Sequence, residues 1–186
     1  MDKLELMKTF YDSARTELIE RIQLRDNALL LYLGAMGALF GVTFSALVAS
    51  EVLLVSPFIA LGAAIIISQH NAVIGALASY CATEIQAYLD EIMPNEGPTQ
   101  WENSASFKEY HQRSTDLRSI GHAILIVTPA IAALAINWRH ALYSPFPNGL
   151  LWWSGAACVG LSMWLIRLVH LWRTKLYMKR KWSNFR

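Results

Sequence analysis

The sequence contains only two cysteines, and their positions exclude functions that need a cysteine framework. Cys81 falls in a polar helical stretch, whereas Cys158 falls in the middle of an apolar one. Two such positions provide neither a disulfide scaffold nor a structural zinc site. We interpret Cys158 as a small packing residue, because a free cysteine in a core behaves as a small hydrophobe.

Catalytic and transport motifs are also missing. The chain has no P-loop, no glycine-rich phosphate loop and no Ser/His/Asp or Cys/His arrangement of nucleophile and base. No carboxylate lies in the middle of an apolar stretch, which argues against a proton-coupled exporter. No acidic ring lines a predicted pore, so a selective cation channel has no support. We therefore expect a protein that is not an enzyme and binds no cofactor or metal, with a small transporter or channel as the alternative.

Charge is absent from the middle of four apolar stretches, and these stretches define the fold class. They cover residues 28–49, 52–68, 120–137 and 150–171. A helix needs about 20 residues, at ~1.5 Å each, to cross a hydrocarbon core of about 30 Å. With 54% apolar and 16% charged residues, the chain of 186 residues fits a small polytopic membrane protein better than a soluble domain. The sequence predicts a single-domain, all-α membrane protein with four transmembrane helices.

Basic residues are distributed unevenly between the two sides of the predicted membrane. Fifteen of the 16 lysines and arginines lie before the first span, between the second and third spans, or at and after the end of the fourth span. Only Arg139 lies on the opposite side, in the loop between the third and fourth spans. The positive-inside rule then places both termini and the central segment in the cytoplasm. We expect a multi-pass protein of the inner (cytoplasmic) membrane, with the lipid bilayer as a partner.

The helical pattern continues outside the four spans. Residues 1–26 read as a cytosolic amphipathic helix, and no Pro or Gly separates it from the first span, which predicts one long helix over Asp2–Ala49. Residues 69–119 are predicted to form a cytosolic helical hairpin with its tip at 94–98, and Asn103 or Ser104 as the N-cap of the returning helix. Pro129 predicts a kink in the third span. The four transmembrane helices would thus extend into a cytosolic helical bundle.

Small residues form one face of the first span. They recur at spacings of three and four, and one pair matches the GxxxG pattern: Gly34, Gly37, Gly41 and Ser45. Small residues let helix backbones approach closely in a membrane. This face fits close packing within the bundle or an interface between subunits of a homo-oligomer, and the sequence leaves both open.

A layer of polar residues lies near the inner boundary of the predicted membrane. Besides Arg25 and Asp26, it comprises His70, Asn71, Arg118, His122, Arg167 and His170. One interpretation is snorkelling at the headgroups combined with polar links between helices. The alternatives are a site for a lipid phosphate or another ligand, and a metal site built from histidines of three helices. If helices two, three and four share a core, we expect His70, Arg118, His122 and Arg167 to come together.

The end of the chain is basic. No acidic residue follows Asp116, and the predicted cytosolic tail over 172–186 carries a cluster of bases: Arg173, Lys175, Lys179, Arg180 and Lys181. Such a cluster is attracted to anionic lipid headgroups by about 1 kcal/mol per charge near the surface. Contact with nucleic acid, which also uses basic and aromatic side chains, is a second and disfavoured interpretation. Docking on the acidic second helix of a neighbouring subunit is a third interpretation.

The layout as a whole resembles that of small prokaryotic membrane proteins. The stretches that carry the resemblance are the charged first helix, RDNALLLYLGAMGALFG over 25–41, SQHNAVIGALASY over 68–80 and the WE pair at 101–102. In size and layout the chain is similar to four-span membrane components of anti-phage defence operons, such as the Kiwa membrane subunit and four-span effectors of nucleotide-signalling immunity. The resemblance implies an oligomeric membrane effector, or a membrane anchor or sensor, whose cytosolic bundle engages a protein partner, and it assigns no role to any residue.

Overall fold

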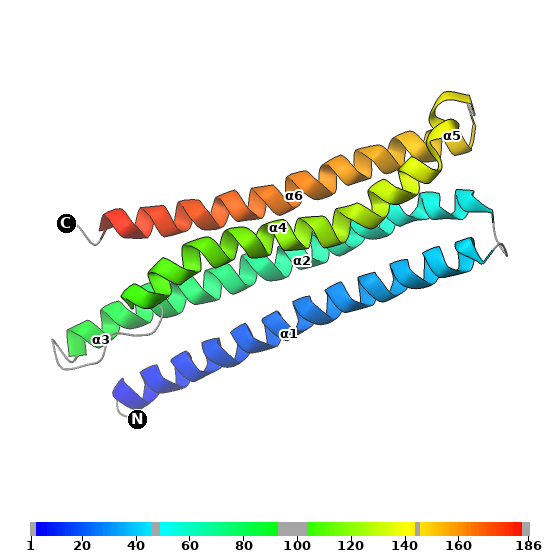
Figure 1. The fold of residues 1–186 in the computed structure, drawn as a ribbon. Coiled ribbons are helices and arrows are strands. Elements are labelled where there is room, and N and C mark those ends of the chain that lie inside the picture. Colours follow the sequence, from blue (N-terminus) through cyan, green and yellow to red (C-terminus); the bar gives the residue numbers. More distant parts are fainter. Residues whose placement is uncertain (1–2, 46–48, 93–103, 144–145, 184–186) are drawn as a thin grey trace.

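The computed structural model of the protein describes residues 3–45, 49–92, 104–143 and 146–183. For residues 105–115 and 173–183 it describes the backbone only. Every regular element in this part of the chain is helical, which confirms the predicted all-helical fold. Four helices are long and apolar enough to cross a membrane. Figure 1 shows them side by side, with the start of α1, the end of α3 and the end of α6 at one end.

The first helix, α1, runs without a break over Lys3–Phe44. The prediction of one long helix is therefore confirmed over this range, but the helix ends before the predicted Ala49. Near its end, the Thr43 hydroxyl donates to the carbonyl of Leu39 at 2.9 Å and the Ser45 hydroxyl to that of Val42 at 2.7 Å.

The second long helix is built from four consecutive elements. A 3₁₀ turn, η1 (Ser50–Val55), leads into α2 (Ser56–Tyr80), a π-helical turn η2 (Cys81–Ile85) and α3 (Gln86–Ile92). The predicted start at Val52 is therefore wrong for the α-helix, which begins where Pro57 occupies its first turn; proline fits there because its φ is preset and no N–H is needed. The predicted continuation beyond residue 68 is confirmed to Ile92, whereas the predicted hairpin tip at 94–98 lies outside the described residues.

The second half of the chain returns along the first. Helix α4 covers Ala105–Ile136, and Ser104 directly precedes it, whereas Asn103 lies outside the described residues. Pro129 lies inside α4, which continues past it. The predicted loop between spans three and four contains a short helix that the sequence did not indicate, α5 (Trp138–Tyr143). Helix α6 covers Asn148–Ser183, so the backbone of the basic segment is helical as well.

Helix α2 is the centre of the packing. It contacts α1 on one side and both α4 and α6 on the other, while α1 contacts little besides α2 and its extension. Burial agrees with this arrangement, since 11% of the apolar stretch of α1 is buried against 44% for that of the second helix. Helix α1 is therefore peripheral, and most of its apolar surface is uncovered.

The part of the structure within 28–45, 50–68, 120–137 and 148–171, here called the apolar half, has one continuous core. Its buried residues come from all four long helices: Tyr32, Met36, Leu54, Ala60, Ala63, Ala64, Ile67, Ile126, Val127, Ala130, Leu134, Val159 and Ile166. The small residues that permit close approach are the alanines of α2. Close approach also occurs at Gly155 of α6, where an added Cβ would lie 3.1 Å from Pro57 Cγ and 3.3 Å from Leu134 Cδ2.

Polar side chains join the helices of the apolar half by hydrogen bonds to backbone carbonyls. The Tyr32 hydroxyl donates to the carbonyl of Ile126 at 2.6 Å, and the Trp152 indole N–H donates to that of Leu134 at 2.8 Å. At the far end, the Asn137 amide N–H₂ donates to the carbonyl of Ser50 at 2.8 Å. Such bonds hold membrane helices together where hydrophobic burial provides no drive between them.

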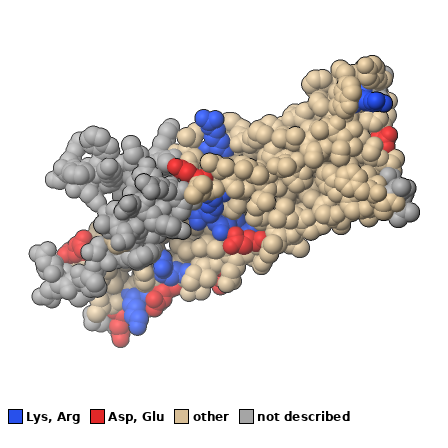
Figure 2. Space-filling model, viewed as in Figure 1, with Lys and Arg blue, Asp and Glu red and all other residues tan. Residues whose placement is uncertain are grey.

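Residues 3–27, 69–92 and 104–119 are here called the polar extension. Its described cluster of buried residues is smaller: Ala14 from α1 and Cys81 and Ile85 from η2, with Met7, Tyr11, Leu77, Tyr80 and Leu89 packed around them. Leu18, Ile74 and Ala82 are also buried in this part. Figure 2 shows the charged side chains gathered on this half, whereas the apolar half is almost free of them except at its far tip.

Candidate functional site

The junction between the apolar half and the polar extension carries most of the buried charge. Arg25 of α1 is 5% exposed there. Its Nε and Nη2 donate to Asp26 Oδ1 at 2.9 and 2.8 Å, and its Nη1 donates to Asn71 Oδ1 of α2 at 3.3 Å. The arginine thus links α1 to α2 at the depth where the apolar stretches end.

A second polar link joins α4 to α6 at the same level. His170 Nε2 lies 3.3 Å from Asp116 Oδ1, and this contact is an ion pair when the imidazole is protonated. The two links stand on opposite sides of α2, so the junction connects all four long helices through polar side chains.

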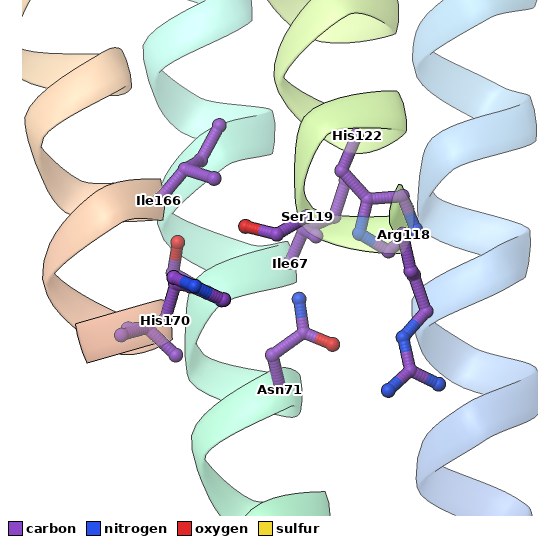
Figure 3. Close-up of a pocket in the computed structure, with 9 residues that line it drawn as sticks. Ile67, Asn71, Arg118, Ser119, His122, Ile166 and His170 are labelled. Carbon is purple, nitrogen blue, oxygen red and sulfur yellow. The ribbon is translucent and has the colours of Figure 1, made fainter. Parts of the chain in front are cut away.

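A pocket opens between these two links, where α2, α4 and α6 meet (Figure 3). Its polar lining comes from Ser68 and Asn71, from Arg118, Ser119 and His122, and from His170; its apolar lining is Ile67, Ile166 and Val169. The cavity volume is about 20 Å³, which is room for one water.

The structure brings together some of the predicted polar residues and separates others. Asn71, Arg118, His122 and His170 line one pocket. His70 lies instead near Arg21 and Arg25, because one residue along a helix turns the side chain by about 100°. Burial, and then the charges of these two arginines, lower the pKa of His70.

Arg167 is exposed and does not line the pocket, although it stands one turn before His170. Of the four residues expected to meet, Arg118 and His122 line the pocket, whereas His70 and Arg167 do not. Within the described part of the chain, no three His, Cys, Asp or Glu side chains gather closely enough to hold a metal ion.

The small-residue face of the first span points away from the other helices. Gly34, Gly37, Gly41 and Ser45 are all exposed, and a Cβ added at any of the three glycines would meet no atom within 4 Å. The alternative that this face packs closely within one chain is therefore wrong. The interface between subunits stays a prediction.

Sequence reasoning missed Ser68, Ser119 and Asp116. Each lies within three residues of a predicted member of the polar layer. Their position at the end of a predicted span could therefore have identified them, whereas their residue type could not. The tail bases Arg173, Lys175, Lys179, Arg180 and Lys181 have a helical backbone in α6, but their side chains lie outside the described part, and their predicted contact with lipid stays a prediction.

Comparison with known proteins gives no match: no protein-family model, no curated protein and no solved structure matches this chain. Its function is therefore inferred from its own geometry and sequence.

Proposed function

We propose that this protein is a non-enzymatic, homo-oligomeric effector of the inner membrane, with both termini in the cytosol. Four transmembrane helices would form a bundle in the bilayer, and the polar extension would engage a cytosolic protein partner or signal. The observation that carries the proposal is continuity. Helix α1 and the α2–η2–α3 helix each run from the apolar half into the polar extension without a loop, so a displacement of the extension must move the attached spans.

The packing supports a transmission of this kind. The polar extension is closed over a small cluster around Cys81 and Ile85, whereas the apolar half has a larger core from all four long helices. The extension could exist in a closed form and in a form in which α1 is separated from η2. A partner that binds the separated form more tightly than the closed form by a few kcal/mol would shift the equilibrium toward separation. The π-helical turn at Cys81–Ile85 lies at this point, and π turns are frequent at functional positions in helices.

The exposed face of α1 supports assembly into oligomers. Gly37 and Gly41 stand on the side opposite to the buried Tyr32 and Met36, so a second copy could approach the α1 backbone without displacing any part of the first. Displacement of α1 in one subunit would then alter its contacts with the next. The resemblance in layout to membrane components of anti-phage defence operons supports defence as the process that this effector serves.

The experiment opens the extension without a partner. Ile85→Asp places a carboxylate in the buried cluster, where its desolvation favours separation of α1 from η2. The matched control is Ala87→Asp, which adds the same charge at an exposed position two residues away. Each purified variant is reconstituted in dye-loaded liposomes, and dye release is compared with that of the wild type.

We expect the wild type and Ala87→Asp to retain the dye and Ile85→Asp to release it without ion selectivity. Hydrogen exchange on the same samples reports whether the extension has opened. Dye retention by Ile85→Asp with an opened extension would contradict the effector role and leave a membrane anchor. A steady ion-selective current from the unmodified protein would favour the channel instead.

A further inference from the structure

The imidazole of His122 lines the pocket at the junction. His122 is only 9% exposed. Burying a polar group without a hydrogen bond is unfavourable, and buried polar groups in proteins normally have a partner. Because this imidazole lines the pocket, a ligand there can form a hydrogen bond with it.

The groups around His122 are mainly hydrogen-bond donors. Arg118 and Ser119 lie on the same helix, and Asn71 faces them from α2 (Figure 3). The Asn71 amide oxygen accepts from Arg25, and Figure 3 shows its nitrogen pointing into the space beside Ser119. Guanidinium, hydroxyl, amide and imidazole N–H or O–H groups are together the donors that bind phosphate oxygens.

The charge at this level is compatible with an anion. Arg25, Arg118 and Asp26 all lie within electrostatic reach of the His122 ring, and Asp116 contacts His170. Arg167 lies on the adjacent surface of α6. The three arginines and two aspartates at this level give a net positive charge even when the histidines are neutral. The two carboxylates are themselves engaged, Asp26 by Arg25 at 2.8 Å and Asp116 by His170 at 3.3 Å.

We infer that this pocket binds a phosphate group, supplied by the headgroup of an anionic phospholipid. The pocket lies where the apolar stretches of α2, α4 and α6 end, which is the depth of headgroup phosphates if the apolar half spans the bilayer. A volume of about 20 Å³ admits one phosphate oxygen and leaves the rest of the headgroup at the mouth. The partly exposed Val169 provides an apolar contact for the glycerol and acyl part. The choice of lipid rests on the proposed membrane location.

The test measures ligand binding to the full-length protein purified in a neutral detergent. Phosphatidylglycerol, diacylglycerol and inorganic phosphate are each titrated and counted by native mass spectrometry. The variants are Arg118→Gln and His122→Gln, with Ser119→Ala as a milder third change. Arg139→Gln, on α5 at the far end of the protein, is the matched control for loss of one positive charge.

We expect phosphatidylglycerol to bind the wild type and diacylglycerol not to bind. Arg118→Gln and His122→Gln should each weaken phosphatidylglycerol binding about tenfold, as loss of a hydrogen bond to a charged group does. Ser119→Ala should weaken it by a smaller factor, and Arg139→Gln should leave it unchanged. Binding of inorganic phosphate alone, lost in the same variants, would show that the phosphate group is recognised but comes from solution.

Equal binding of phosphatidylglycerol and diacylglycerol, or unchanged phosphatidylglycerol binding in helical Arg118→Gln, His122→Gln and Ser119→Ala variants, would overturn the inference. The assay uses the purified protein and involves no dye release. A failure of the pocket is therefore distinguishable from a failure of the proposed effector function.

Discussion

The apolar half and the polar extension share the same helices but are held together differently. In the apolar half, thirteen buried residues from all four long helices form one cluster, and hydrogen bonds to carbonyls join the helices. In the polar extension, the cluster among the described residues has three buried members, Ala14, Cys81 and Ile85, between α1 and η2. Among the described side chains, the helix pair α1 and α2–η2–α3 therefore has a larger buried cluster at its apolar end than at its polar end.

This difference identifies the part that can move. Regions with few buried contacts open at low free energy, while the main core opens only with the whole protein. The junction with Arg25, Asn71 and the pocket lies between the two. A separation that starts in the extension reaches the junction before it reaches the apolar core.

The largest expected effect is in the apolar half, at Gly155. Gly155→Leu places a branched side chain where even a Cβ would lie 3.1 Å from Pro57 Cγ. Overpacking of this kind costs about 1–3 kcal/mol. We expect the unfolding free energy in detergent, measured by denaturant titration, to fall by that amount.

Gly160→Leu is the matched control, since a Cβ at Gly160 meets nothing within 4 Å. It lies five residues further along the same helix. If Gly160→Leu destabilised the protein as much as Gly155→Leu, the assignment of close packing to the α2–α6 contact would be wrong.

An intermediate effect is expected in the polar extension. Ile85→Ala removes most of a buried side chain from the small cluster, which costs about 2 kcal/mol, the low end of the range for this change, where the surroundings can collapse. We expect faster hydrogen exchange over residues 3–20 and 75–92 and unchanged exchange in the apolar half. Equal acceleration in both halves would mean that they open as one unit and would remove the basis for comparing them.

The smallest effect on a single chain is expected at the exposed glycines. Gly37→Leu combined with Gly41→Leu adds side chains into open space, so helicity and the unfolding free energy should change little. The oligomer mass in mild detergent should nevertheless decrease, because the added side chains hold a second copy away. An unchanged mass would assign this face to lipid.

The long helices could be predicted because their signals are local in the sequence. These signals are uninterrupted apolar stretches and apolar residues at spacings of three and four. The extension of α1 before its apolar stretch followed from the amphipathic pattern of residues 1–26 and from the absence of Pro and Gly between this pattern and the stretch. The extension of α2 followed from the helical pattern that continues after residue 68. The 3₁₀ start before Pro57, the π turn at Cys81–Ile85 and α5 were not predicted. Pro57 was nevertheless a local signal for the start of α2, because proline fits the first turn of a helix.

The candidate site was predicted only in part, since sequence places residues at a depth but not on a face. Asn71, Arg118, His122 and His170 do share one pocket, whereas His70 and Arg167 do not. The glycine face shows the same limit. Its composition suits close packing, yet the rotation of α1 turns it outward, and the alanines of α2 supply the close contact.

The central claim is that α1 crosses from water into lipid at the junction. Single spin labels are placed at exposed α1 positions from Leu4 to Phe44 in the protein reconstituted in liposomes, with Cys81 and Cys158 replaced by serine. Collisions with oxygen, which concentrates in lipid, are compared with collisions with a water-soluble nickel complex. We predict access to nickel before Arg25, access to oxygen after Ala28, and one crossover between them. Access to nickel along the whole helix would contradict the account, as would a crossover elsewhere.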